Sequence, residues 1–346
     1  EKCPSNADNR QAKISTILAS GDKNIDLISV NDEMISEFKH KGYLEPLEKN
    51  VMTEEVRDSF PQKYLESICE ENGHIYSVPF QMDIMMFWVN QELLKQAGLD
   101  EIKNTGDFDI LQKSLKNPDQ YAYGDAWENT HVYNSLSQFV NFWGGDYFDW
   151  TDPKTKDAAR YMKSMLDEKN TSPAQFVDQY EQMEEKFIRG KYGCVFMYTS
   201  ALGTFLDADV YGKNKIHMAP LPVLHKKKAT NIATWQYVLN NASENKDAAV
   251  RFLQYAAGYE GSTEYAKIMK SYPARVDVIE NEDIDLEGID MIRKYLREYT
   301  LNARPLCENS MGAVSDMGKL FQGYVLGQCE EDSFFEQAQN CINTYY

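Results

Sequence analysis

Segments with a helical period alternate with short apolar runs along almost the whole chain. Residues 10–19 place Ile14, Ile17 and Leu18 on one helical face, and residues 26–30 then form an apolar run typical of a buried strand. Helices that alternate with strands in this way cover the faces of a sheet. The pattern therefore predicts an α/β protein.

Later segments continue the alternation. Thr53 is a good helix cap, and the apolar spacing after it predicts one longer helix that ends at Gly73. Asp152 followed by Pro153 predicts the start of another helix, because Pro is tolerated in a first turn. Further expected elements are a β-rich stretch over 74–90, helices over 92–98, 182–189 and 247–257, strands over 194–198 and 234–239, and a mainly helical part from 286 onward.

The length of the chain predicts two lobes. It has 346 residues, of which 42% are hydrophobic. Single hydrophobic cores stop growing at about 250 to 300 residues, so this much apolar material favours two cores. We place the first crossing between them in the β-rich stretch over 74–90.

The charge of the chain excludes nucleic acid as a partner. The formal net charge is −18, whereas nucleic-acid binding needs clustered Lys and Arg to displace counterions. The one basic run, Lys226 to Lys228, is interpreted as a solvated loop. The best candidate for a membrane span, residues 76–89, is shorter than the ~18 apolar residues that a span requires and is interrupted by Gln81 and Asp83.

Motifs of catalytic and metal sites are missing from the sequence. It contains no GxxxxGK[ST], GxGxxG, HExxH or GxSxG pattern. The five histidines share no ligand spacing, and the six cysteines are too dispersed for a zinc site, so we expect neither a metal nor a cofactor. Disulfides are possible, but free thiols are the favoured interpretation of these cysteines.

Aromatic residues are the distinctive feature of the composition. They make up 12% of the chain, and several tryptophans have polar neighbours. Trp127 precedes Glu128, Trp143 lies three residues before Asp146, and Trp235 precedes an amide side chain. Flat rings beside carboxylates and amides suit a carbohydrate, whose apolar face stacks on the ring while its hydroxyls are hydrogen-bonded. The alternative is that each tryptophan is buried for packing alone.

Motif-bearing segments follow one another in a fixed order. They are ILASGDKNIDLISVND, GYLEPLEKN, NGHIYSVPFQMDIMMFWVNQELLKQAGL, FIRGKYGCVFMYTSALGTF, IHMAPLPV, NNASENKDAAVRFLQYAAG, YPARVDV and LGQCEEDSFFEQAQNCINTYY. Together they resemble the extracellular solute-binding proteins of ABC importers, specifically the sugar-binding branch that includes the maltose-binding proteins. The resemblance runs over nearly the whole chain, although the first strand of the family is missing from it.

The resemblance implies a two-lobed periplasmic-binding-protein fold of the Venus-flytrap type (type II). Lobe 1 would comprise residues 1–81 and 234–285, and lobe 2 residues 82–233 and 286–346. The hinge would lie near 81–83 and 233–234. Ligand would bind between the lobes and stabilise a closed state.

The resemblance and the aromatic pattern together give a set of expected ligand-binding residues. Three of them have an alternative role: Asp83 as a hinge hydrogen bond, Ser200 as a helix cap and Arg275 as a holder of the fold. The set is Asn31, Asp32, Gln81, Asp83, Trp127, Glu128, Trp143, Asp146, Tyr198, Ser200, Trp235 and Arg275.

The expected function is that of a non-catalytic receptor of a bacterial ABC importer that captures a sugar or short oligosaccharide. Its partners would be the carbohydrate ligand and a membrane permease, and the receptor would be a monomer. It would be lipid-anchored on the extracellular face of the membrane, or periplasmic, because the abrupt start at residues 1–3 suggests a missing leader and tether. A receptor for a polyamine and a glycosidase are the alternatives.

Overall fold

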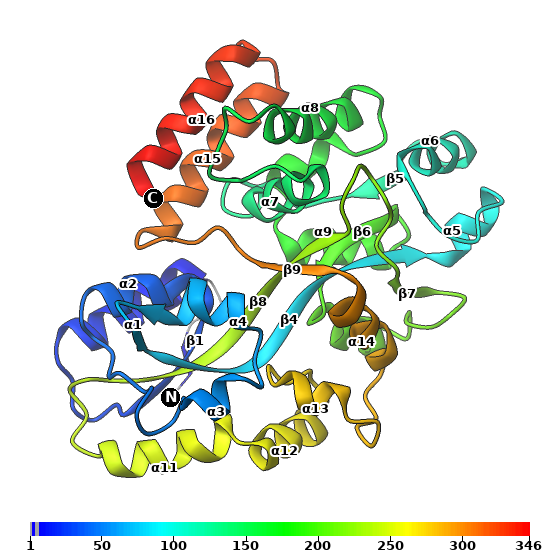
Figure 1. The fold of residues 1–346 in the computed structure, drawn as a ribbon. Coiled ribbons are helices and arrows are strands. Elements are labelled where there is room, and N and C mark those ends of the chain that lie inside the picture. Colours follow the sequence, from blue (N-terminus) through cyan, green and yellow to red (C-terminus); the bar gives the residue numbers. More distant parts are fainter. Residues whose placement is uncertain (1, 4–6) are drawn as a thin grey trace. The chain divides into compact units, whose positions relative to one another are not determined.

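The computed structural model describes residues 2–3 and 7–346, which form two compact units. The strands β4 (Ser77–Asn90) and β8 (Ala229–Leu239) each belong partly to one unit and partly to the other (Figure 1). Unit 1 contains the residues up to Asp83, Ile232–Ile289 and Leu306–Met311, and unit 2 contains Ile84–Asn231, Asp290–Pro305 and Gly312–Tyr346.

The expected division placed residues 82–83, 232–233, 286–289 and 306–311 in lobe 2, whereas all four stretches lie in unit 1. The longest of them is 306–311, in which Glu308 lies 3.4 Å from the ring of His40. The turn is closed locally, because the Ser310 hydroxyl donates to the carbonyl of Cys307 at 2.7 Å. A stretch this short does not change the hydrophobic period, so the sequence does not reveal which unit it belongs to.

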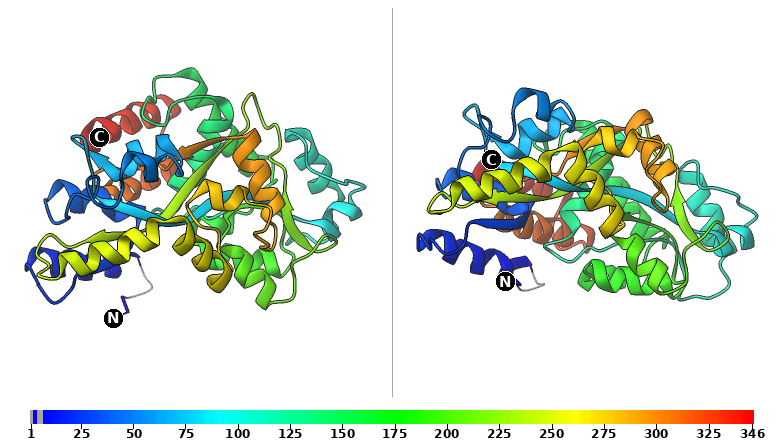
Figure 2. Two further views of the ribbon diagram at one scale, coloured as in Figure 1. Left: turned by 60° about the horizontal axis from the view of Figure 1, so that its bottom comes forward. Right: turned by 90° about the horizontal axis from the view of Figure 1, so that it is seen from below.

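The centre of unit 1 is an antiparallel pair of strands. β1 (Leu27–Asn31) pairs with the second half of β8, so that Leu27 lies opposite Leu239 and Asn31 opposite Trp235. In unit 1, α11 (Lys246–Ala257) and α12 (Tyr259–Met269) are consecutive helices that contact each other, seen in yellow in Figure 2. The remaining elements are α1 (Ala7–Ala19), η1 (Asp32–Met34), α2 (Ile35–His40), α3 (Glu54–Arg57), α4 (Gln62–Tyr64), η2 (Leu65–Cys69), β2 (Glu70–Glu71), β3 (His74–Ile75) and α13 (Val276–Glu280).

The predicted first helix and strand are confirmed. Ile14 and Leu18 of α1 are buried, as are Ile28 and Val30 of β1, while Ser29 between them is exposed. This alternation follows from the two-residue period of a strand.

The predicted long helix from Thr53 to Gly73 is wrong. The chain instead forms three short helical segments, α3, α4 and the π-turn η2, with a break over residues 58–61. Pro61 explains the break, since it has no N–H to donate and disfavours helical backbone in the residue before it. Thr53 precedes α3 but makes no capping hydrogen bond with its side chain.

The centre of unit 2 is a mixed sheet. The second half of β4 pairs antiparallel with β6 (Tyr192–Tyr198) and β7 (Ile216–Ala219), β5 (Tyr121–Gly124) is parallel to β6, and β9 (Thr300–Ala303) pairs with β8. All of β6 is buried, as expected for a strand covered on both faces. The helices are α5 (Gln91–Gln96), α6 (Thr105–Ser114), α7 (Val132–Trp143), α8 (Pro153–Asp167), η3 (Pro173–Val177), α9 (Tyr180–Ile188), α10 (Ala201–Asp207), α14 (Ile289–Glu298), α15 (Ser310–Val325) and α16 (Glu331–Tyr345).

The start of α8 confirms the sequence prediction in detail. The Asp152 carboxylate accepts a hydrogen bond from the backbone N–H of Lys154 at 2.9 Å, and Pro153 occupies the first helical position. The side chain thus satisfies one of the N–H groups that have no partner within the helix.

Replacing the cap should destabilise the protein measurably. Asp152→Ala is expected to lower the free energy of unfolding by about 0.5 to 2 kcal/mol, because the first turn of α8 loses its acceptor. Lys154→Ala is the matched control, since it removes an exposed side chain but keeps the backbone donor. Urea denaturation followed by circular dichroism measures both, and equal stability of the two variants would contradict the capping role.

Candidate functional site

A cavity of about 240 Å³ lies in unit 2 where β6 ends. On α9, Glu184 lies four residues after Tyr180 and three after Glu181, and on α10 Thr204 lies three after Ala201, so the lining residues of each helix share one side of it. The end of β6 supplies the remaining residues. The lining residues are Tyr180, Glu181, Glu184, Met197, Tyr198, Ser200, Ala201 and Thr204.

Tyr198 is held on both sides. Its hydroxyl donates to the Asn134 side-chain oxygen at 2.9 Å, and its ring centroid lies 6.0 Å from that of Tyr180 at an interplanar angle of 63°. The Arg304 guanidinium lies over the Tyr198 ring at 5.9 Å and donates to the hydroxyl of Tyr133 at 2.6 Å. These contacts fix two tyrosine rings in the wall of the cavity.

Ser200 lies in the same wall as Tyr198. It precedes α10 but makes no capping hydrogen bond with its side chain, which is exposed and lines the cavity. Two residues of the expected ligand-binding set, Tyr198 and Ser200, are therefore brought together here.

Glu128 is the third expected residue near this wall. Its carboxylate accepts hydrogen bonds from the backbone N–H and the hydroxyl of Thr130 at 2.9 and 2.7 Å, and it lies 3.1 Å from Nδ1 of His131. The hydrogen bond to His131 lowers the pKa of Glu128 to about 2. The His131 ring meets that of Tyr180 at 5.5 Å, so these contacts continue to the cavity wall.

A buried carboxylate supports the segment that carries Glu128. Asp125 is 2% exposed and accepts hydrogen bonds from the Tyr123 hydroxyl at 2.7 Å, the Trp127 indole N–H at 2.9 Å and the Ser135 hydroxyl at 2.6 Å. Burial raises the pKa of Asp125, although the hydrogen bonds oppose this shift. The loop between β5 and α7 is therefore tied to both elements.

Sequence reasoning missed most of the residues around this cavity. His131 has no ligand spacing in the sequence, and the expected set does not contain Tyr180, Glu184 or Arg304. The spacing of Tyr180, Glu181 and Glu184 on one helical face was visible in the sequence. Nothing in that spacing indicated which strand end the face would lie beside.

Trp127 and Trp143 are both buried within unit 2, and a ligand role for them stays a prediction. Trp127 is 0% exposed and meets Phe176 and Phe321 edge-on at 5.6 and 5.3 Å. Trp143 is 7% exposed and its ring is stacked on that of His225 at 5.0 Å and 2°. Both rings pack against aromatic neighbours within unit 2, which is the alternative role that the sequence left open for each tryptophan.

The polar neighbour of Trp143 also has a local role. Asp146 is exposed, and its carboxylate accepts a hydrogen bond from the backbone N–H of Phe148 at 2.9 Å. Its own N–H donates to the hydroxyl of Thr155 at 3.1 Å, which joins the turn to α8. The polar context that suggested a ligand site is explained by turn formation.

Two expected residues lie at the end of β1 in unit 1: Asn31 is its last residue and Asp32 follows it. The Asn31 side chain accepts a hydrogen bond from the N–H of Glu33 at 3.3 Å and caps η1. The Asp32 carboxylate accepts from the Tyr64 hydroxyl at 2.8 Å, and that hydroxyl lies 2.7 Å from the hydroxyl of Thr234. A ligand role for Asn31 and Asp32 stays a prediction.

The crossing strand β4 and the turn before α13 carry the next expected residues. The Gln81 side chain accepts a hydrogen bond from the Tyr265 hydroxyl at 2.7 Å, and the two roles considered for Asp83 both stay predictions. Arg275 pairs with Asp277 at 2.6 Å and donates to Ser59 and to the carbonyl of Ala257. These contacts of Arg275 hold the fold of unit 1.

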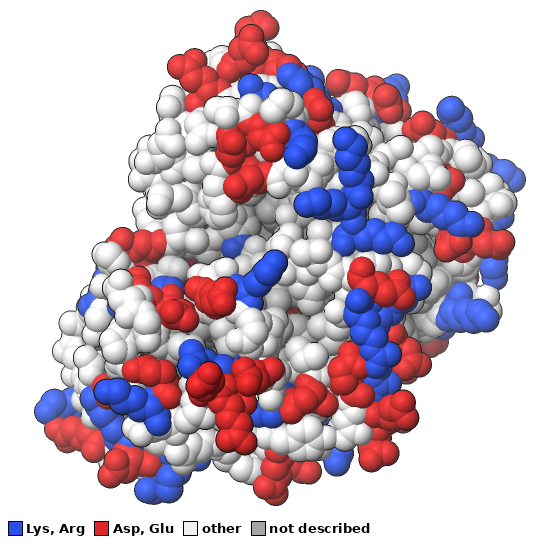
Figure 3. All heavy atoms as spheres, viewed as in Figure 1, with Lys and Arg blue, Asp and Glu red and all other residues white. Residues whose placement is uncertain are grey.

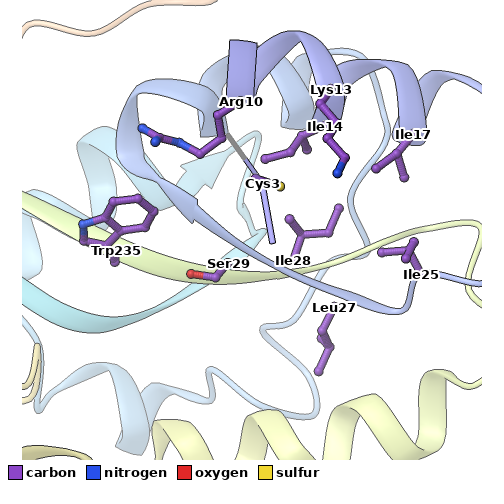
Figure 4. A pocket seen from close by; sticks show the side chains of 10 residues that line it. All are labelled: Cys3, Arg10, Lys13, Ile14, Ile17, Ile25, Leu27, Ile28, Ser29 and Trp235. Carbon is purple, nitrogen blue, oxygen red and sulfur yellow. The ribbon is translucent and has the colours of Figure 1, made fainter. Parts of the chain in front are cut away.

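Trp235 lines a larger cavity, of about 390 Å³, in unit 1 beneath α1 (Figure 4). The Arg10 guanidinium lies 5.2 Å from the centre of its ring. Aliphatic side chains dominate the rest of the lining, which offers few groups to hydrogen-bond a polyol. Besides Trp235 and Arg10 it contains Cys3, Lys13, Ile14, Ile17, Ile25, Leu27, Ile28 and Ser29. We therefore take the smaller cavity of unit 2 as the candidate site.

Several global properties bear on the class of the protein. Acidic and basic side chains are interspersed on the face seen in Figure 3. Burial raises the pKa of the free thiol of Cys69 to about 12 and that of Cys194 well above its usual value.

Over residues 2–3 and 7–346, no three or more His, Cys, Asp or Glu side chains form a group that could hold a metal ion. No helix in that part of the chain has the length and apolarity needed to cross a membrane.

Comparison with known families decides the classification. Residues 4–263, more than half of the chain, match the family of bacterial extracellular solute-binding proteins. The chain belongs to this family. The resemblance inferred from the ordered sequence motifs is thereby confirmed.

Individual members of the solute-binding family share low identity with this one. A probable amino-acid ABC transporter periplasmic-binding protein of Sinorhizobium fredii is 24% identical over 66% of this chain and 54% of its own length. The arabinooligosaccharide-binding protein of Bacillus subtilis is 22% identical over 78% of this chain and 65% of its own. The chain thus spans between about half and two thirds of these curated relatives.

The fold is shared with solved solute-binding proteins. One from Thermotoga lettingae, bound with α-D-tagatose, superposes with a TM-score of 0.83 at 18% identity, over 97% of this chain and 89% of that one. The predicted α/β periplasmic-binding-protein fold is confirmed.

The contact between Glu128 and His131 predicts a measurable titration. His131→Ala should raise the pKa of Glu128 from about 2 towards its ordinary value of 4.5, because the largest cause of the shift is removed. Because folding lowers the pKa of Glu128, its ionised carboxylate stabilises the folded protein above pH 4.5. This contribution to the free energy of unfolding is lost as the pH falls towards 2.

Carboxyl titration by NMR between pH 1.5 and 6, a range set by the two pKa values, measures the effect. His225→Ala is the control, because His225 contacts Trp143 and not Glu128. A Glu128 pKa that is the same in both variants would contradict the assigned cause.

Proposed function

We propose that this solute-binding protein is the non-catalytic, substrate-binding component of a bacterial ABC importer that captures a sugar or short oligosaccharide. The observation that carries the proposal is the cavity of unit 2. It places the rings of Tyr180 and Tyr198 beside the hydroxyls of Ser200 and Thr204 and the carboxylate of Glu184.

The chemistry of this cavity suits a pyranose or furanose ring. The C–H face of a sugar is apolar and packs against a flat aromatic ring. Its hydroxyls donate to carboxylates and exchange hydrogen bonds with Ser and Thr hydroxyls. An apolar wall with a few convergent polar groups is typical of small-molecule sites.

Two related proteins support a sugar in particular. One is named for arabinooligosaccharides, and the solved structure with the same fold contains α-D-tagatose. Another relative is named a probable amino-acid binding protein, so amino acids belong in the test of the ligand class.

The remaining parts of the proposal follow from the role of such receptors. The loaded protein would act as a monomer and deliver its ligand to the membrane permease of the importer. It would work on the extracellular face of the membrane, held by a lipid anchor, or in the periplasm.

A receptor for a polyamine is the second candidate. Glu181 and Glu184 line the cavity with Tyr180 and Tyr198, and carboxylates with aromatic rings bind cations through ion pairs and cation–π contacts. A glycosidase is tested separately, since turnover of chromogenic glycosides would contradict a non-catalytic role.

A thermal-shift screen tests the ligand class. Because a ligand that binds only the folded state raises the unfolding midpoint, we expect an upward shift with one series of mono- or oligosaccharides. The same screen should contain amino acids and polyamines. Shifts confined to polyamines would favour the second candidate, and shifts confined to amino acids would contradict both.

Removing one ring of the cavity should weaken binding of the sugar found in that screen. Tyr180→Ala is expected to cost about 1 to 3 kcal/mol of binding free energy, as for a lost aromatic anchor. Isothermal titration calorimetry measures the change, with Tyr255→Ala as control because that exposed ring lies in unit 1. Equal affinities of the two variants would remove Tyr180 from the site.

A further inference from the structure

We propose that the cavity of unit 2 selects a sugar that carries a protonated amine, that is, an amino sugar. The inference rests on the proposed function and names the substrate class of the same site. Its basis is the position of Glu181 and Glu184 in a cavity that also contains two tyrosine rings and two hydroxyls.

The charges that line the cavity have one sign. Glu181 and Glu184 are three residues apart on α9, which places them on the same helical face, and both line the cavity. The other six lining residues are uncharged, and none of the eight is Lys or Arg. A cationic group of a ligand would therefore meet two carboxylates and no opposing positive charge within the lining.

Glu184 is in an environment that disfavours its negative charge. It is half-buried, and burial together with the charge of Glu181 raises its pKa, while a hydrogen bond with Thr204 opposes the shift. A protonated amine in the cavity would offset both unfavourable causes. A neutral hydroxyl would compensate only the lost hydration.

Helix stabilisation explains only one of the two carboxylates. Glu181 lies in the first turn of α9, where a negative charge interacts favourably with the helix dipole. Glu184 lies beyond that turn, where this interaction has fallen off. Glu184 is instead hydrogen-bonded to Thr204 of α10, which holds its carboxylate at the cavity.

Charged groups outside the lining also lie near the cavity wall. Glu128 and His131 form a contact of their own behind Tyr180. Arg304 lies over the ring of Tyr198 and donates to Tyr133, and it is not among the lining residues. The Tyr180 ring adds a cation–π contribution for an ammonium group, whereas the Tyr198 ring already has the Arg304 guanidinium over it.

The shape of the cavity favours an amine on a sugar ring over a simple amine. Its volume of about 240 Å³ is larger than an ammonium group needs, and it has two aromatic rings for stacking. The hydroxyls of Ser200 and Thr204 can both donate to and accept from the hydroxyls of a sugar ring, whereas the methylenes of a polyamine offer them no partner.

Calorimetry with matched sugars tests the proposal. The probes are glucosamine, N-acetylglucosamine and glucose, with the β-1,4-linked dimers of each, because they share a ring and differ in charge. We expect glucosamine or its dimer to bind at least tenfold more tightly than its acetylated and neutral counterparts. Glu184→Gln, which keeps the shape and a hydrogen-bond acceptor, should remove most of this preference.

Glu185→Gln is the matched control. Glu185 neighbours Glu184 on α9 but pairs with Arg189 and does not line the cavity, so the preference should persist. Circular dichroism establishes that both variants are folded.

The outcomes separate this inference from the proposed function. Binding of neutral sugars with equal or higher affinity would overturn the amino-sugar assignment and leave the sugar receptor supported. Binding of spermidine with no sugar bound would overturn both. An affinity loss in Glu184→Gln that is equal for glucose and glucosamine, or no binding of glucosamine and its dimer, would also overturn the assignment.

Discussion

A carboxylate buried without hydrogen-bond donors carries a large desolvation penalty, and Asp125 illustrates how unit 2 avoids it. Its donors come from β5, from the following loop and from α7, so the three segments must meet in one geometry for the charge to be tolerated. That geometry directs the Trp127 ring inward and presents Glu128 beside His131. The wall of the candidate site thus depends on a polar interaction in the core beneath it.

Contacts between elements also fix the side chains at the end of β6. A strand that ends leaves its last side chains without neighbours in the sheet, and in α/β folds such ends are where ligands bind. Tyr198 is the last residue of β6, and Asn134 and Tyr180 hold it from α7 and α9. With the tyrosine rings fixed by protein contacts, little conformational entropy remains to be lost when a ligand binds.

Local signals in the sequence were reliable where one residue decides the backbone. Asp152 and Pro153 start α8 as predicted, since a cap and a fixed φ act within one turn. Pro61 has the opposite effect and divides the stretch after Thr53, although the apolar spacing of that stretch suggested a continuous helix. Hydrophobic period gives the buried face of a segment but does not guarantee that the segment is unbroken.

The α/β class, most helices and strands, and the resemblance to the solute-binding family could be read from the chain alone, because period, caps and ordered motifs are local properties. Tertiary structure decided which aromatic rings remain available to a ligand. Trp127 and Trp143 pack inward, whereas Tyr180 of α9 and Tyr198 of β6 meet at one cavity. The physical reason is that burial of a ring depends on partners from other segments, and their approach is set by packing of the whole unit.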